Sequence, residues 1–444
     1  MDSRHRQIIK KVTEFYFKSG DFNGIALENL FNTISLDETI FKSILTELIV
    51  DRSIDLVYEG DIPNPHIKPF PANPVQVQLE KLKSFEIKWH IEDAEKNAEK
   101  INIGGKMVTL FVRSIGCCVY PTPEHLRKIV DWKKYVSQPF TLRLAMGEWQ
   151  LRPYFFELSI LAIYRNDPRY RYQTDDITGS LYSNGDGSLN RSDDIMLAHF
   201  YFGFDQTGVR AVAVLLTDLQ ALSPQHQQIW RAKMLPNSFR FGLHPDARQS
   251  ILGHFPNRVS IFSAFRKELE VINEMATKIK GKPLMKKDFQ YEEKPENFGF
   301  LILPTLREYE SFCHTLDRMM SENINEEFFD GEINQFDLRN GQEMDKIRGI
   351  TKLDIWITKS FDLEEPDRKM EMIKTFRDVR ELRSKPAHIH LKNEWSLSYY
   401  HFQRKLIYRA YTAIRTLRLI LAIHPDCDDV KVSDWLYKGQ IRDF

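Results

Sequence analysis

Hydrophobic residues in the first 60 positions recur at the three- and four-residue spacing of amphipathic helices. The spacing predicts one helix that stops near Gly20, a second over residues 25–31, and a third that begins after Ser35. Ser35 and Glu38 also have the spacing of a capping box, which favours a helix start at this point. Residues 54–58 are mostly apolar and predict a strand.

The order helix, helix, helix, strand over residues 1–60 resembles a winged-helix domain. The third helix of a DNA-reading domain is expected to be basic, but this one carries three acids against a single lysine, Lys42. We therefore expect the domain to contact protein or to dimerise, and DNA binding is the less favoured alternative.

Beyond this domain the hydrophobic pattern becomes mixed, which predicts an α+β middle domain over residues 75–283. Five prolines between Asp61 and Pro74 mark the boundary, because proline interrupts helices and central strands alike. A helical pattern at 258–280 closes the domain. The expected strands are Val108–Val112, Thr141–Ala145, Arg169–Tyr172 and a hairpin of Leu197–Phe204 and Val209–Leu216 that turns at Gly208.

The C-terminal part, residues 300–444, has the pattern of an all-α bundle of four helices. Its expected helices are Thr305–Met320, Asp337–Phe361, Pro366–Ser384 and Leu397–Ile423. In the third of them the apolar face is expected to consist of Met370, Ile373, Phe376, Val379 and Leu382. The whole chain is therefore expected to be a multidomain α+β protein.

Composition adds expectations about location and cofactors. The chain has 444 residues, 42% of them hydrophobic and 28% charged, as in ordinary soluble proteins. No apolar run is long enough for a membrane span, and the first residues show no signal-peptide core, so we expect a cytoplasmic protein without membrane contact. The four cysteines lack Cys-x-x-Cys spacing, so neither a metal site nor a cofactor is expected.

Charge is unevenly distributed although the formal net charge is zero. Residues 368–418 hold thirteen Lys and Arg against four acids, a local excess of +9. Such an excess attracts phosphate and indicates a nucleic-acid partner. The arginines of the last helix are then either solvated or ion-paired surface residues or phosphate contacts: Arg404, Arg409, Arg415 and Arg418.

A candidate catalytic pair lies where the third helix of the bundle ends. Pro386 must end this helix, because its ring clashes with the carbonyl four residues earlier. Arg383 then lies in the last turn and His388 just beyond the break, so the two side chains are expected to converge. A similar spacing also occurs at Arg248/His254, Arg307/His314 and Arg418/His424. What distinguishes Arg383/His388 is its context: the third helix of four, the helix-breaking Pro386, the local excess of +9, and the polar Ser384 after the arginine.

The run Arg383-Ser384-Lys-Pro-Ala-His388 in the third of four helices resembles the ribonuclease motif of the HEPN superfamily, the higher-eukaryote-and-prokaryote nucleotide-binding helical bundles. The resemblance covers about 125 of the 444 residues. It implies catalytic roles for Arg383, His388 and Ser384, a homodimer through the C-terminal bundle, and a part in bacterial anti-phage defence or a toxin system. The residues expected to bind RNA are Lys385, Arg380, His390 and Arg404.

These residue types suit RNA cleavage without a metal ion. An imidazole such as His388 titrates near neutral pH and moves the proton of the attacking 2′-hydroxyl, while Arg383 stays charged and grips the phosphate. The expected products carry a 2′,3′-cyclic phosphate and a 5′-hydroxyl, and DNA resists because it lacks the nucleophile. Two alternatives stay open: Arg383 is only a helix C-terminal cation, or the bundle is a non-catalytic RNA- or protein-binding module with a degenerate motif.

Overall fold

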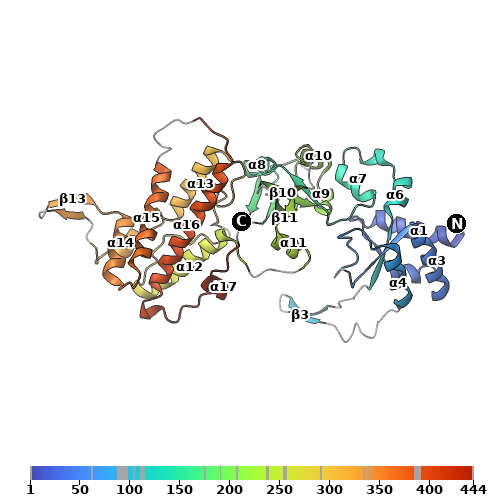
Figure 1. The fold of residues 1–444 in the computed structure, drawn as a ribbon, viewed down its shortest axis with the longest axis horizontal. Helices are drawn as coiled ribbons and strands as arrows, with labels where there is room; N and C mark the ends of the chain where they lie inside the picture. The colour runs from blue at the N-terminus through green and yellow to red at the C-terminus, as the bar shows by residue number, and fades with distance from the viewer. Residues whose placement is uncertain are drawn as a thin grey trace. The chain divides into compact units, whose positions relative to one another are not determined.

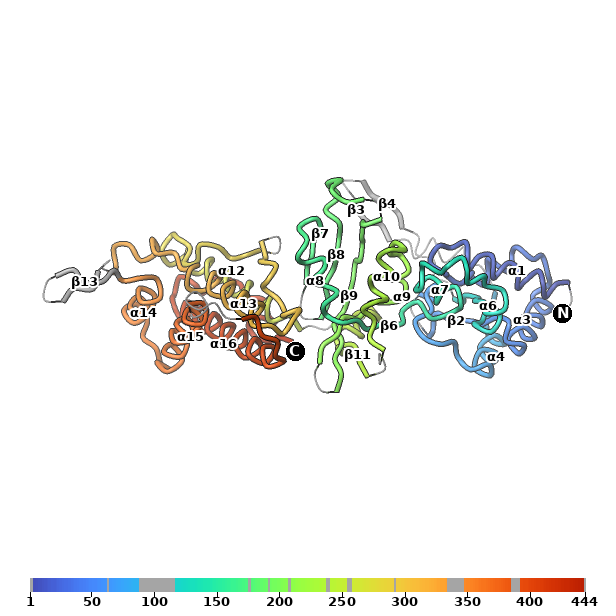
Figure 2. The backbone as a smooth tube through the Cα atoms, turned by 90° about the horizontal axis from the view of Figure 1, so that it is seen from above, coloured from blue at the N-terminus to red at the C-terminus, as the bar shows by residue number. Residues whose placement is uncertain are grey.

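The protein is mixed α+β with a helical C-terminal region, as Figure 1 and Figure 2 show in two views. The computed structural model describes residues 3–61, 64–87, 99–103, 106–110, 116–174, 177–190, 192–206, 209–236, 240–253, 258–290, 293–333, 336–339, 342–384 and 392–442. It divides into two compact units. Unit 1 consists of Met1–Phe156, Gly185–Ala198 and Ala213–Ser238, and unit 2 of Glu157–Asn184, His199–Val212 and Phe239–Phe444. This division differs from the three domains expected, because the middle stretch contributes to both units.

The N-terminal elements follow the predicted order. They are α1 (Ser3–Lys18), β1 (Ile25–Ala26), α2 (Leu27–Asn32), α3 (Glu38–Val50) and β2 (Ile54–Tyr58). A later strand, β5 (Cys117–Pro121), pairs antiparallel with both β1 and β2 and gives the sheet order β1-β5-β2. The second predicted helix is therefore correct only from Leu27 onward, because its first two residues pair as a strand.

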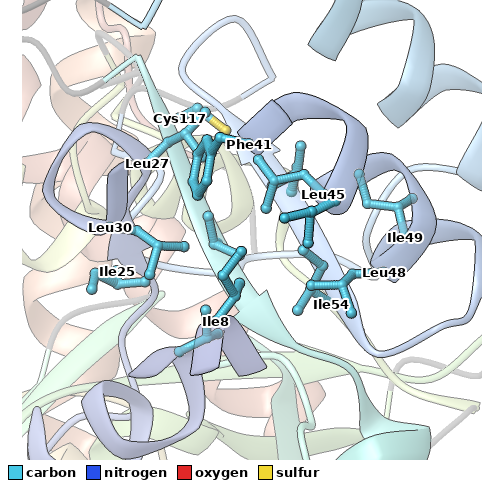
Figure 3. Close-up of a cluster of buried hydrophobic side chains, with 14 of the residues drawn as sticks. Ile8, Ile25, Leu27, Leu30, Phe41, Leu45, Leu48, Ile49, Ile54 and Cys117 are labelled. Carbon is cyan, nitrogen blue, oxygen red and sulfur yellow. The ribbon is translucent and has the colours of Figure 1, made fainter. Parts of the chain in front are cut away.

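The buried faces of these three helices meet the sheet in one hydrophobic core. Ile8 of α1, Leu27 of α2 and Phe41 of α3 are fully buried there, and Figure 3 shows Phe41 beside Cys117 of β5. The predicted capping box is wrong, since the side chain of Asp37 caps α3 by accepting the Thr39 N–H at 2.8 Å.

Among the described residues, unit 1 also contains the helices α4 (Val75–Ser84), α6 (Pro123–Ile129), the 3-10 helix η1 (Trp132–Tyr135), α7 (Pro139–Ala145), α9 (Leu216–Ala221) and α10 (Pro224–Ala232). The strand expected at 141–145 is wrong, because these residues belong to α7. Pro139 suits the first turn of a helix. The side chain of Gln227 accepts the N–H of Phe140 at 3.1 Å, which satisfies a donor that the helix itself leaves unpaired.

A second antiparallel sheet has the order β6-β10-β9-β8-β7, and β11 pairs with β9. Its strands are β6 (Pro153–Phe156), β7 (Tyr170–Thr174), β8 (Thr178–Ser183), β9 (Met196–Phe204), β10 (Arg210–Leu215) and β11 (Gly242–Leu243). The predicted hairpin of β9 and β10 is confirmed, while Gly208 in its turn lies outside the described residues. A separate ribbon pairs β3 (Glu99–Ile103) with β4 (Lys106–Leu110), so the strand expected at 108–112 begins earlier.

The C-terminal helices are α12 (Ile261–Lys280), α13 (Leu306–Met319), α14 (Gly349–Ser360), α15 (Pro366–Ser384), α16 (Ser398–Leu421) and α17 (Asp434–Tyr437). Short helices elsewhere in unit 2 are α8 (Ser159–Arg165), α11 (Pro245–Ile251), and the 3-10 helices η4 (Glu326–Phe329) and η6 (Pro425–Cys427). Helix α16 packs against both α12 and α15, and α15 also packs against α13 (Figure 1). The long helix α12 thus belongs to the helical region and not to a separate middle domain.

Two expectations for the helical region are corrected. The helix predicted over 337–361 is shorter, because β12 (Phe336–Arg339) and β13 (Gln342–Lys346) form a hairpin before α14 begins. The dipeptide Asn340-Gly341 between these strands is a hairpin-turn signal in the sequence. On α15, Met370 is exposed, while Ile373, Phe376 and Val379 are buried as expected.

Three properties of the described part of the chain concern membranes, metals and thiols. No helix in it combines the length and the apolar character that crossing a bilayer requires. The described His, Cys, Asp and Glu residues form no group of three or more placed to hold a metal ion. Cys117, Cys118, Cys313 and Cys427 are buried free thiols.

Candidate active site at the end of helix α15

Arg383 lies in the last turn of α15, as the sequence predicted. Its Nη1 donates to Oδ2 of Asp317 at 2.9 Å and to the carboxylate of Glu322. The hydrogen bond to Asp317 is the main reason why the pKa of Arg383 is raised above its ordinary value. The guanidinium is therefore fixed and charged at any pH at which the protein is folded.

Helix α13 supplies the anchor for this guanidinium. Asp317, in the last turn of α13, has a fully buried side chain and also accepts a hydrogen bond from the Ser321 hydroxyl. The backbone N–H of Glu322 donates to the Asp317 carbonyl at 3.1 Å, which holds the turn after α13 in place. A buried carboxylate needs a charged partner. Arg383 is that partner, and 32% of its own side chain stays exposed.

The two carboxylates differ in how they affect phosphate binding. The side chain of Asp317 is 0% exposed, whereas 40% of the Glu322 side chain is exposed. Arg383, Asp317 and Glu322 together carry a net charge of −1, so a phosphate must compete with Glu322 for Nη1. An exposed glutamate gives way at little cost, because surface ion pairs contribute only about 0–1 kcal/mol.

Three other predicted site residues are described: Ser384, Arg380 and Arg404. Ser384 is exposed beside Arg383, and its hydroxyl donates to the Arg380 carbonyl of its own helix at 2.8 Å. Helices α15 and α16 are in contact through Arg409, which hydrogen-bonds Asp378 at 2.5 Å. Arg404, five residues before Arg409 on α16, is exposed.

Lys385, Pro386, His388 and His390 lie outside the described residues. The convergence of His388 on Arg383 accordingly stays a prediction. The structure does locate the residue from which the segment carrying His388 starts, because α15 ends at Ser384, two residues before Pro386.

The basic field expected around the motif is weaker than the sequence count indicates. In the described part of the chain, five carboxylates from outside residues 368–418 pair with cations inside this segment, so part of the excess counted from the sequence is neutralised locally. These carboxylates are Glu268, Asp317, Glu322, Asp354 and Glu365.

Arg418 is the clearest departure from a phosphate-binding surface. It is 1% exposed and hydrogen-bonds the fully buried Glu268 of α12 through Nε. Burial raises the pKa of Glu268, while the hydrogen bond from Arg418 acts in the opposite direction. This pair joins α12 to α16 inside the helical region and is unavailable to RNA.

Asp317 is the site residue that sequence reasoning missed. It lies 66 positions before Arg383, and no motif connects the two. One signal was present: Asp317 follows Phe312, Cys313 and Leu316 on the buried face of an amphipathic helix, where a carboxylate requires a buried partner.

In comparisons with protein-family models, curated proteins and solved structures, the chain matches none.

Proposed function

We propose that the protein is a metal-independent endoribonuclease whose C-terminal helices form a HEPN-like catalytic domain. The observation that carries the proposal is Arg383, a guanidinium fixed by the buried Asp317 at the end of α15 and still one-third exposed. Fixed cations with accessible donors stabilise the negative charge that develops on phosphate in the transition state. His388 follows five residues later in the chain and supplies an imidazole for proton transfer.

The proposed reaction transfers the phosphodiester within the RNA. The 2′-hydroxyl loses its proton to His388 and attacks the adjacent phosphorus, while Arg383 binds the non-bridging oxygens. The bond from phosphorus to the 5′-oxygen breaks, which closes the 2′,3′-cyclic phosphate, and the leaving oxygen takes up a proton from solvent. Since each chain has a single His388, we further propose a homodimer in which two copies of the motif act on one cleft. A nuclease of this kind harms its own cell unless restrained, which suits a defence or toxin role.

The first experiment tests the chemistry with the unmodified full-length protein in EDTA. Single-stranded RNA is expected to be cut to fragments with 2′,3′-cyclic phosphate and 5′-hydroxyl ends. An oligonucleotide with the same bases and deoxyribose at every position is expected to stay intact. Fragments with 5′-phosphate ends, or cleavage that requires Mg²⁺, would contradict the mechanism.

A second candidate function is supported by the ion pairs of Arg383. Because two carboxylates already engage Nη1, Arg383 is also suited to a purely structural role, which would leave the bundle as a non-catalytic RNA- or protein-binding module. Fluorescence anisotropy with labelled RNA separates the two functions. Binding that produces no fragments favours the non-catalytic module, whereas fragments with cyclic phosphate ends favour the enzyme.

For the N-terminal elements we infer a winged-helix-like fold that contacts protein and not DNA. The support is the order α1-β1-α2-α3-β2 with β5 returning between β1 and β2. On α3, the side chain of Lys42 lies 2.9 Å from Glu38, and Glu47 lies 2.9 Å from His5 of α1. Helix α3 therefore offers little positive charge to a phosphate backbone.

This inference predicts weak binding to duplex DNA. Titration of a labelled random-sequence duplex at physiological salt is expected to give a Kd no tighter than about 10⁻⁴ M, the weak end of non-specific binding. The measurement is fluorescence anisotropy, with single-stranded RNA as the comparison ligand. A Kd in the nanomolar range for any duplex would overturn the inference.

A further inference from the structure

Unit 1 contains a pocket of about 470 Å³ that the proposed ribonuclease reaction does not use. Four stretches of chain line it: residues 52–55 at the start of β2, 68–72, 123–127 of α6, and 143–152 between α7 and β6. Pockets of about 300–1,000 Å³ are the usual size for small-molecule sites.

The lining of the pocket is rich in arginine. Its cations are Arg52, Lys68, Arg127, Arg143 and Arg152, and its carboxylates are Asp55, Glu124 and Glu148. Five cations against three carboxylates leave a net charge of +2. Arg52 and Arg127 are exposed, so they are accessible to a ligand that enters from solvent. This balance favours an anion.

Arg143 and Arg152 are held in place around one carboxylate. Glu148 accepts a hydrogen bond from Arg152 and lies 3.5 Å from Nη1 of Arg143. One negative charge thus orients two guanidinium groups, which leaves this cluster with a net charge of +1. Arginine is suited to such a site, because its five N–H donors form bidentate contacts with phosphate oxygens.

Lys68 provides a buried cation in the pocket wall. Its Nζ lies 3.1 Å from Oδ2 of Asp55, and both side chains are 7% exposed. The backbone of Lys68 is clamped by Gln150, whose Oε1 accepts the Lys68 N–H at 2.6 Å and whose N–H donates to the Lys68 carbonyl at 2.9 Å. A buried ion pair adds little net stability. An ammonium has three donors, and the bond to Asp55 uses one of them.

An aromatic wall completes the pocket. Trp149 is one of the lining residues, and the guanidinium carbon of Arg152 lies 5.9 Å from the centre of its ring. Phe70 meets the same ring edge-on at 6.2 Å and supports its position. Indole and guanidinium planes are the groups on which nucleobases stack.

We propose that this pocket binds a nucleotide. The phosphates lie against Arg52, Arg127 and Lys68, and the base lies against Trp149. The proposal is independent of the RNA-cleaving reaction, because none of the lining residues belongs to the proposed motif.

The test is isothermal titration calorimetry on the full chain with three probes: ATP, adenosine and inorganic tripolyphosphate. ATP is expected to bind at least roughly tenfold more tightly than either of the other two, since it alone uses both the cations and the aromatic wall. The affinity for ATP is also expected to fall as the salt concentration rises. No binding of ATP at millimolar concentration would overturn the proposal, and so would equal affinity for tripolyphosphate and ATP.

Variants assign the binding to this pocket. Arg52→Ala and Arg127→Ala are each expected to weaken ATP roughly tenfold, and both replace exposed side chains, so the fold is expected to persist. Trp149→Leu is expected to weaken ATP and adenosine but to leave tripolyphosphate unchanged. The matched control is Arg231→Ala, an exposed arginine of α10 outside the lining. If Arg231→Ala weakens ATP as much as Arg52→Ala does, the pocket is not the site.

Discussion

Replacing Arg418 by methionine is expected to destabilise the helical region by about 3–5 kcal/mol, because the change leaves the carboxylate of Glu268 buried without a partner. Both side chains are almost fully buried between α12 and α16. The loss is measured by urea unfolding and, locally, by hydrogen exchange of the α12 and α16 amides. The matched control is Arg368→Met, which removes an exposed ion pair with Glu365 and is expected to cost less than about 1 kcal/mol.

The destabilisation is expected to depend on pH with a defined sign. Burial raises the pKa of Glu268, and removing Arg418 takes away the larger of the two influences that oppose this rise, while the nearby charge of Arg415 still lowers the pKa. A carboxyl whose pKa is higher in the folded state than in the unfolded state lowers the free energy of unfolding when it must ionise. The loss of unfolding free energy caused by Arg418→Met therefore grows as the pH rises above about 4.3, the pKa of glutamate in an unfolded chain. Below that value Glu268 is neutral in both states, and the deficit shrinks.

A double variant separates an unpaired charge from lost packing. Glu268→Gln combined with Arg418→Met removes both charges and is expected to recover most of the stability and to lose the pH dependence. If the single and double variants unfold alike at every pH, then the buried ion pair does not explain the role of Arg418.

Local patterns in the sequence predicted local structure well. Helical spacing located α1, α3, α12, α15 and α16, because each buries one face at intervals of three and four residues. The prediction of a strand at 141–145 was wrong, because a short apolar run is compatible with a helix as well as with a strand. In the structure, the side chain of Gln227 accepts N–H groups at the start of α7 and so supports a helix there. Gln227 lies 87 residues after Phe140, so the short run itself does not contain this signal.

Charge was the property that the sequence predicted least well. A count over residues 368–418 cannot include Asp317, Glu268 or Asp354, which reach the basic helices only after folding. The pocket of unit 1 was missed for the same reason, because its lining combines residues that are far apart in the sequence, from Arg52 to Arg152. Sequence reasoning therefore located Arg383 on its helix, but it missed the partner that fixes the side chain.

Replacing either member of the proposed catalytic pair is expected to reduce RNA cleavage by roughly 10²- to 10⁴-fold, the usual range for a positioned acid or base. His388→Ala removes the group that moves protons. Arg383→Lys keeps a positive charge but loses bidentate contact with phosphate, so cleavage is expected to fall in that variant as well. The measurement is the initial rate of fragment formation in EDTA. The matched control is His314→Ala on α13, an exposed histidine seven residues after Arg307 that is expected to keep the full rate.

Arg383→Ala requires a separate design, because the substitution also leaves Asp317 buried without a charged partner and is expected to lower stability. The double variant Arg383→Leu with Asp317→Leu removes both charges and is expected to recover much of the stability while cleavage stays abolished. Thermal unfolding and the cleavage rate, measured on the same samples, distinguish the two roles. Should cleavage return together with stability in the double variant, Arg383 serves only to hold α15 against α13, and the catalytic assignment is wrong.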